Sequence, residues 1–184
     1  GFVPTPISIP SGPNIAVTRT ASASSYETGY EPYKADDGVY FDNNARNTWS
    51  SALNQDVNAW WNVDLAQKDS IGKVKIQFRG RNGVYFGVPK NITFKVSDDN
   101  VNWTTVISKS TNVPTDGGTY SGVPYTYNLN TSGRYLKLVF EDGSQNTVYK
   151  YDQLAEVAVY RQYSNENLTG MGLGQFNYVG TWIN

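Results

Sequence analysis

The sequence of 184 residues contains no cysteine and no histidine. These absences exclude disulfide bonds, thiolate and imidazole metal ligands, and catalysis by a cysteine or serine nucleophile paired with a histidine base. Methionine occurs once, and no long segment shows the helical spacing of apolar residues. The fold must therefore be stabilised by packing, or by a hard cation that oxygen ligands can bind.

The sequence also lacks an excess of either charge, since 15 basic and 16 acidic residues give a net charge of -1. It has no basic cluster of the kind that nucleic-acid binding requires. No apolar run is long enough to cross a membrane as a helix. These features argue against nucleic acid and membrane as partners.

What is present favours β structure, because the hydrophobic residues (39% of the chain, with 14% aromatic) are mostly Val, Ile, Tyr, Phe and Trp. Apolar and polar residues alternate in 59–65, 73–78 and 92–96, and turn-forming residues separate these segments. This pattern predicts antiparallel strands with one buried face. We therefore expect an all-β protein with an antiparallel jelly-roll β-sandwich of about eight main strands.

Composition divides the chain into three parts. Residues 1–14 contain four of the eight prolines and are expected to be a linker or an extended N-terminal arm. Residues 15–162 form the predicted sandwich. Residues 163–184 are Gly-rich and then aromatic; they are either a tail that packs back on the domain or, as we prefer, a linker and the start of a following module.

Several segments, taken together, resemble the discoidin domain, also called the factor V/VIII type C domain. They are GKVKIQF, ITFKVSDDNVNWTTV, GRYLKLVF, LAEVAVY, ADDGVYFDNNARNTWSS and AWWNVDLA. The most similar branch is the family-32 carbohydrate-binding modules of bacterial glycoside hydrolases. The resemblance implies a discoidin-like sandwich and a non-catalytic, secreted module. It would bind polysaccharide or oligosaccharide and be attached to further domains of the same chain, including a polysaccharide-degrading enzyme.

The resemblance also implies a structural Ca²⁺ where an Asp-Gly loop meets the last strand. Such an ion is bound by carboxylate and backbone carbonyl oxygens. The matching candidates for its ligands are Lys34, Asp37, Asp42, Asn47, Thr48, Ala155 and Glu156. The alternative is that Asp36, Asp37 and Asp42 only cap turns.

Family modules bind sugar on loops at one end of the sandwich, where aromatic rings meet sugar C–H faces and polar side chains meet hydroxyl groups. The candidate ligand-binding residues are Tyr26, Glu27, Tyr30, Asn54, Arg79, Arg81, Asn82, Tyr85, Phe86, Asn146 and Tyr149. Arg79 and Arg81 have the same parity and are expected to face the same side. Tyr85 and Phe86 could instead fold inward and anchor their loop.

The predicted core consists of large rings and alternating apolar residues. By resemblance it includes Trp49, Trp60 and Trp103, and by pattern it includes Val63, Leu65, Ile76, Phe78, Phe94, Val96, Leu136, Leu138 and Val157.

Two other functions stay open at this stage. One is the adhesion or membrane-lipid binding of other discoidin relatives, with Tyr85 and Phe86 as inserting residues, although the loops lack a basic cluster for anionic lipid. The other is glycoside hydrolysis, for which Glu27 and Asp142 are a conceivable carboxylate pair without supporting spacing.

Because FNYVGTWIN resembles the opening of a family-6-type carbohydrate-binding module, we favour an α-glucan such as α-1,3-glucan as the target of the domain.

Overall fold

The structure is a computed structural model that describes residues 12–40 and 47–162. This part of the chain contains ten strands and one short 3-10 helix. They are β1 (Thr20–Ala23), η1 (Pro32–Ala35), β2 (Trp49–Ser50), β3 (Ala59–Gln77), β4 (Gly80–Arg81), β5 (Val84–Tyr85), β6 (Ile92–Ser97), β7 (Thr104–Ser110), β8 (Tyr125–Phe140), β9 (Gln153–Leu154) and β10 (Glu156–Tyr160).

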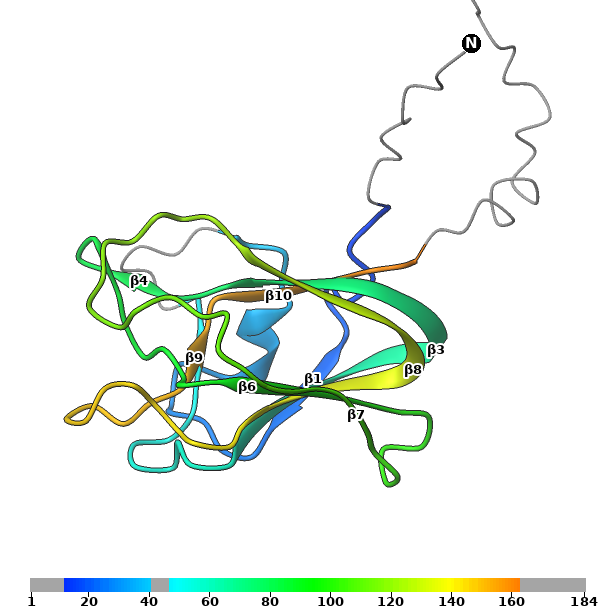
Figure 1. The fold of residues 1–184 in the computed structure, drawn as a ribbon, viewed down its shortest axis with the longest axis horizontal. Helices are drawn as coiled ribbons and strands as arrows, with labels where there is room; N and C mark the ends of the chain where they lie inside the picture. The colour runs from blue at the N-terminus through cyan, green and yellow to red at the C-terminus, as the bar shows by residue number, and fades with distance from the viewer. Residues whose placement is uncertain (1–11, 41–46, 163–184) are drawn as a thin grey trace, which may run out of the picture.

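The two long strands β3 and β8 pass through both layers of a sandwich (Figure 1). Their antiparallel pairing is interrupted between Asp64 and Asp69, and both strands bend there from one layer to the other. One layer has the order β1-β3-β8-β6-β7 and contains the first half of β3 and the second half of β8. The second half of β3 and the first half of β8 form the other layer with β10. If each half is counted separately, the layers contain five and three strand segments.

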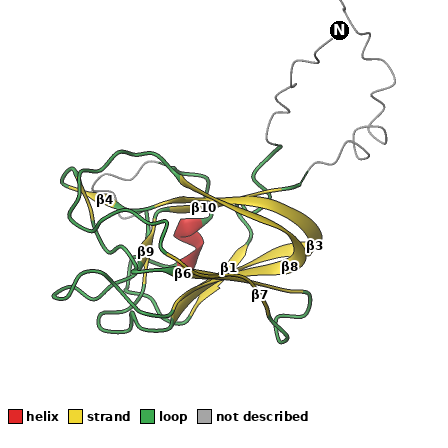
Figure 2. Cartoon of the chain, in the orientation of Figure 1, coloured by secondary structure: helices red, strands yellow, loops and turns green. Residues whose placement is uncertain are grey.

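Every strand pair in the described residues is antiparallel. The only helical element among them is the single turn of η1, which lies between the layers (Figure 2). The antiparallel β-sandwich that was predicted from sequence alternation is therefore confirmed, and the eight segments agree with the expected number of main strands.

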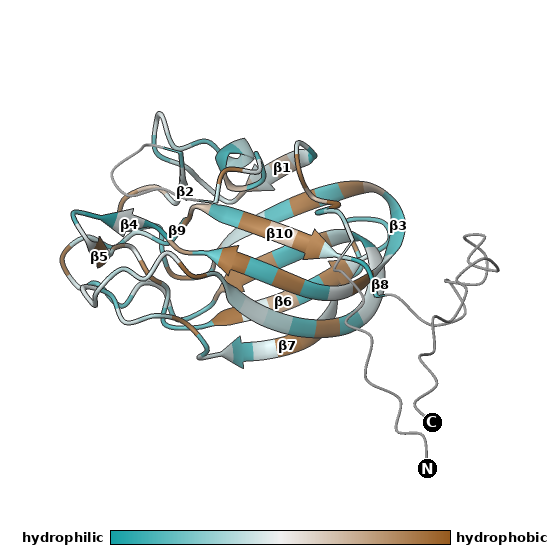
Figure 3. Cartoon of the chain, turned by 90° about the horizontal axis from the view of Figure 1, so that it is seen from above, coloured by the Kyte–Doolittle hydropathy of each residue, from teal (hydrophilic) through white to brown (hydrophobic). Residues whose placement is uncertain are grey.

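Alternation of side chains explains why these segments pair as they do. Hydrophobic and hydrophilic residues alternate along β3 and β10 (Figure 3). In β3, Val74 and Ile76 are fully buried, whereas Lys73 and Lys75 are only half-buried. A shift of one residue in the pairing would place the lysines in the core, and this cost determines the register.

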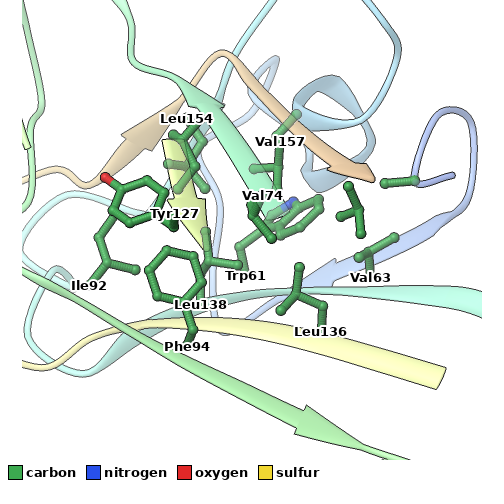
Figure 4. Close-up of a cluster of buried hydrophobic side chains, with 14 of the residues drawn as sticks. Trp61, Val63, Val74, Ile92, Phe94, Tyr127, Leu136, Leu138, Leu154 and Val157 are labelled. Carbon is green, nitrogen blue, oxygen red and sulfur yellow. The ribbon is translucent and has the colours of Figure 1, made fainter. Parts of the chain in front are cut away.

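The core lies between the two layers, where Trp61, Phe94 and Leu138 pack closely together (Figure 4). All nine core residues predicted from the pattern are buried, and so is Trp49. The prediction that Trp60 and Trp103 are buried was wrong. Both are half-exposed on the outer face of the first layer, where Lys137 Nζ lies 4.7 Å and 3.9 Å from the respective ring centroids.

The two ends of the sandwich differ. The bends of β3 and β8 form one end, and β10 runs toward it, so the described part of the chain also ends there (Figure 1). β2, β4, β5 and β9 lie at the opposite end (Figures 1 and 3). Asn14, the last residue of the expected linker, belongs to the fold, because its Oδ1 accepts hydrogen bonds from Ala16 and Val159 N–H. Residues 1–11 and 163–184 lie outside the described residues.

Candidate functional site

A cavity of about 350 Å³ opens at the end of the sandwich that carries β2, β4, β5 and β9. Four separate chain segments supply its lining. The lining residues are Glu27, Thr28, Tyr30, Ser50, Arg79, Arg81, Phe86, Tyr151 and Gln153. Five of the predicted ligand-binding residues therefore come together: Glu27, Tyr30, Arg79, Arg81 and Phe86.

Arg79 is the most constrained charged group of the cavity, since it is only 6% exposed. Its Nη1 donates to Gln153 Oε1 at 3.1 Å, and its Nη2 donates to the Tyr30 hydroxyl at 3.5 Å. The guanidinium carbon lies 5.2 Å from the Tyr30 ring centroid and 5.8 Å from that of Phe86. These contacts hold the guanidinium in one orientation beside two aromatic rings, in the cation–π distance range.

Arg81 is placed by a tight hairpin in which β4 pairs with β5. The two connecting residues, Asn82 and Gly83, both have positive φ angles, of 52° and 79°. This is the Asn-Gly turn that suits a two-residue hairpin. Arg81 is exposed, and its guanidinium carbon lies 5.0 Å from the Phe86 ring centroid. Arg79 and Arg81 are separated in sequence by one residue, Gly80, and both line the cavity.

Gly87 brings the loop after Phe86 against Gln153. Its φ angle is 72°, and a Cβ atom at this position would lie 2.6 Å from Gln153 Oε1. The Gly87 carbonyl accepts a hydrogen bond from Gln153 N–H at 2.9 Å. Gln153 in turn donates from Nε2 to Ser50 Oγ at 3.0 Å. Gly87 is therefore needed for the close approach that positions the amide next to Arg79.

Tyr85 does not belong to the cavity. It is 5% exposed, its hydroxyl lies 2.6 Å from Ser121 Oγ, and its ring packs edge-on against Tyr120 with a centroid distance of 5.1 Å. Tyr85 is therefore the inward-facing anchor of the loop, one of the two alternatives that the sequence left open. Phe86, the next residue, points the other way because side chains alternate along an extended chain.

The remaining predicted ligand residues lie outside the cavity lining. Tyr149 is 53% exposed and reaches the rim, with its ring centroid 6.0 Å from that of Phe86. Tyr26 is also 53% exposed, and Asn54 and Asn82 are exposed turn residues with positive φ. Asn146 lines a different hollow, and its Oδ1 accepts from Val148 and Tyr149 N–H, so it caps its own turn.

Sequence reasoning missed Thr28, Ser50 and Gln153 of the cavity lining. Gln153 and Ser50 lie in very short strands, β9 and β2, which pair with each other through these two residues. In the sequence, each is an ordinary polar residue within a short segment, and no surrounding pattern indicates that it contributes to a binding site. Tyr151 also lines the cavity. Burial raises the pKa of its hydroxyl, and the charge of Glu27 adds to this effect.

A second group of acidic residues surrounds η1 and the start of β10. Glu156 is fully buried, with Oε1 accepting from Asn14 Nδ2 at 3.3 Å and Oε2 from Gly38 N–H at 3.2 Å. Burial raises its pKa to about 8, and the charges of Asp37 and Asp36 contribute. Asp36 is 1% exposed, and neither of its carboxylate oxygens has a hydrogen-bond partner. Burial, together with the charge of Asp37, raises its pKa to about 7.

These acidic residues bear on the predicted calcium ligands. Asp37, one of the predicted ligands, accepts a hydrogen bond from Val39 N–H through Oδ1 at 2.9 Å, so it also caps a turn. Lys34 contributes to η1, Thr48 and Ala155 are buried, and Asn47 is half-buried. Asp42 lies outside the described residues. Within 12–40 and 47–162, no three acidic side chains converge as a metal cluster. Any ion here would therefore also need backbone carbonyl ligands.

Residues 20–157 match the family model described as the F5/8 type C domain. The chain belongs to the F5/8 type C domain family. The resemblance seen in the sequence is thereby confirmed, and no curated protein matches this chain.

Solved structures with the same fold include three bacterial binding modules. A chitosan-binding module from a chitosanase/glucanase of Paenibacillus sp. IK-5 is 27% identical, with 80% of this chain and 98% of that chain covered and a TM-score of 0.60. A fucose-binding module of Streptococcus pneumoniae is 26% identical, with 81% and 95% covered and a TM-score of 0.59. CBM32-3 from a family 31 glycoside hydrolase of Clostridium perfringens is 20% identical, with 83% and 95% covered and a TM-score of 0.63; this last likeness shows the fold alone. This F5/8 type C domain thus has the fold of carbohydrate-binding modules.

Proposed function

We propose that this F5/8 type C domain is a non-catalytic carbohydrate-binding module that holds a secreted bacterial polysaccharide-degrading enzyme on its substrate. One observation carries the proposal: the cavity places the oriented guanidinium of Arg79 beside the rings of Tyr30 and Phe86. An aromatic ring suits the apolar face of a sugar, and a fixed set of donors suits its oxygen atoms. The binding modules of similar structure named above support it.

The cavity lies at the end of the sandwich away from both ends of the described chain (Figures 1 and 3). The chain therefore enters at residue 12 and leaves at residue 162 away from the cavity. This supports the proposal, because an enzyme attached through either end need not cover the cavity that a long polymer would occupy.

Binding to a glycan array and to insoluble polysaccharides tests the proposal. The variants Phe86→Ala and Tyr85→Phe provide a matched pair from one loop. Phe86→Ala should weaken saccharide binding at least about tenfold, which corresponds to about 1.4 kcal/mol. Tyr85→Phe should bind like the parent protein, since its hydroxyl contacts Ser121 and not the cavity. If the parent protein binds no saccharide, the proposal is wrong.

Membrane-lipid binding finds less support. The expected pair of inserting residues is reduced to Phe86, because Tyr85 is buried. In the described ranges, no helix is both long and apolar enough to cross a bilayer. Sedimentation with liposomes of neutral and anionic lipid provides the direct comparison with the saccharide assay.

A catalytic pair of Glu27 and Asp142 finds no support either. Glu27 lines the cavity described above, whereas Asp142 lines another hollow and pairs with Lys109. The proposed preference for α-1,3-glucan rests on residues 163–184, which lie outside the described part of the chain.

We also propose that Ca²⁺ stabilises the domain at η1 and β10, with Asp37, Glu156 and backbone carbonyls such as that of Lys34 as ligands. The buried, unpartnered carboxylate of Asp36 supports this, because a cation would offset the repulsion among Asp36, Asp37 and Glu156. Calorimetry on chelated protein should show heat of Ca²⁺ binding and a higher melting temperature. Asp37→Asn should lose both, and the absence of both effects in the parent would refute the site.

A further inference from the structure

The cavity contains positive charge that no acidic side chain among the described residues neutralises. Across residues 12–40 and 47–162, neither Arg79 nor Arg81 forms a salt bridge, whereas Arg134 pairs with Asp64 at 2.8 Å and Arg161 pairs with Asp69 at 2.6 Å. The unpaired state is ordinary for the exposed Arg81. It is unusual for Arg79, because a buried charge is normally paired with an opposite charge.

The groups that hold Arg79 are all neutral. They are the amide oxygen of Gln153, the hydroxyl of Tyr30 and the two aromatic rings. Its Nε atom is buried and has no hydrogen-bond partner. Neutral partners orient the guanidinium, but they leave its charge uncompensated in a region from which most water is excluded.

Glu27 is the acidic residue of the cavity lining. Its Oε1 accepts a hydrogen bond from Leu53 N–H at 2.7 Å, so this oxygen is committed to its own loop. Glu27 makes no ion pair with either arginine at 4.0 Å or less. With two guanidinium groups and one carboxylate, the lining carries an excess of one positive charge.

We propose that this cavity selects a saccharide that carries a negative group, either a uronate carboxylate or a sulfate ester. The inference rests on the proposed carbohydrate-binding function and names its substrate class. Arg79 and Arg81 contact the oxygen atoms of the negative group, and Phe86 packs against the sugar ring. Guanidinium groups bind oxyanions by charge-assisted hydrogen bonds, which are about twice as strong as neutral ones. A neutral α-glucan would leave the charge of Arg79 unpaired.

The test uses an array on which each acidic glycan is printed beside a neutral counterpart with the same sugar chain. Uronate oligosaccharides such as trigalacturonate are paired with their methyl esters, and sulfated galactan fragments with their desulfated forms. Nigerotriose represents neutral α-1,3-glucan. Calorimetry then gives the dissociation constants for the best pair at low and at high salt.

We expect the acidic member to bind at least about tenfold more tightly than its neutral counterpart. This preference should decrease as the salt concentration rises. A preference within the uronate pairs identifies a carboxylate, and a preference within the sulfated pairs identifies a sulfate ester. Equal binding of both members, or binding of neutral glycans alone, overturns this inference and leaves the proposed function intact. Binding to no glycan overturns both.

Two variants change the charge of the cavity with little change in its shape. Gln153→Glu places a carboxylate where the amide oxygen now contacts Arg79, so it should abolish the preference for the acidic member. Glu27→Gln removes the negative charge of the lining and should increase that preference several-fold. The melting temperature of Gln153→Glu should not fall below that of the parent, which separates lost binding from lost folding. An unchanged preference in both variants would contradict the assigned role of these charges.

Discussion

Asp152 directly precedes Gln153, the residue that orients Arg79. It is fully buried, and neither of its carboxylate oxygens has a hydrogen-bond partner. Burial raises its pKa well above the ordinary value, repulsion from Asp56 adds to this, and Lys90 partly opposes it. The folded protein therefore keeps a proton that the unfolded chain has released. The free energy of unfolding should then decrease as pH rises above the pKa of the unfolded carboxyl, about 3.9.

The variant Asp152→Asn removes this titration while preserving the shape of the side chain. Each pH unit between the unfolded and folded pKa values costs about 1.4 kcal/mol. As pH rises from about 5 to about 7, the free energy of unfolding of Asp152→Asn should therefore increase relative to that of the parent, by at most about 1.4 kcal/mol per pH unit. For a domain of this size, each kcal/mol gained should raise the melting temperature of the variant relative to the parent by about 2–4 °C.

Urea denaturation, followed by tryptophan fluorescence at a series of pH values, measures this difference. Taking the difference between variant and parent cancels the contributions of Asp36 and Glu156, whose pKa values are also raised. Asp64→Asn is the control with the opposite sign. Hydrogen bonds from Arg134 lower the pKa of Asp64, so this pairing stabilises the fold above the unfolded pKa and is lost as pH falls. A difference for Asp152→Asn that does not change with pH would refute the reasoning.

The remaining predictions concern the loop that forms the cavity and the outer face of the sheet. Gly87→Ala should displace Gln153, because the new Cβ would lie 2.6 Å from its Oε1. The variant should therefore bind saccharide more weakly and be less stable than the parent. An unchanged affinity in calorimetry would argue against the positioning of Arg79 by Gln153. Trp103→Ala should lower the free energy of unfolding by about 1 kcal/mol, because the contact between the ring and Lys137 is lost. Urea denaturation measures this change. The saccharide affinity should stay unchanged, because this face of the sheet is remote from the cavity.

Much of the fold was predictable because strand alternation is a local property. In 59–65, the pattern places Trp61, Val63 and Leu65 on one face and Trp60 on the other, and the structure buries the first set. The error about Trp60 came from the family resemblance, which suggested a buried ring at this position. The alternation was the better guide, because the pleat of a strand obliges neighbouring side chains to point in opposite directions.

The candidate site was only partly predictable. Arg79 and Arg81 follow a strand at positions of equal parity, and Phe86 stands in the same loop, so local sequence brought these three into consideration. Gln153 could not be found in this way. Its amide reaches Arg79 across 74 positions of sequence because β9 pairs with β2 and packs against Gly87.

The sequence by itself determined the class of the fold and which aromatic and arginine side chains were candidates for the site, since both depend on residue type and on spacing between near neighbours. Only the tertiary structure decided that Tyr85 faces inward, that Glu27 and Tyr30 share a cavity with Arg79, and that Arg79 has no acidic partner in the described residues. The reason is physical. Burial and charge compensation depend on atoms that distant parts of the chain bring to one point, and alternation along a single strand contains no information about them.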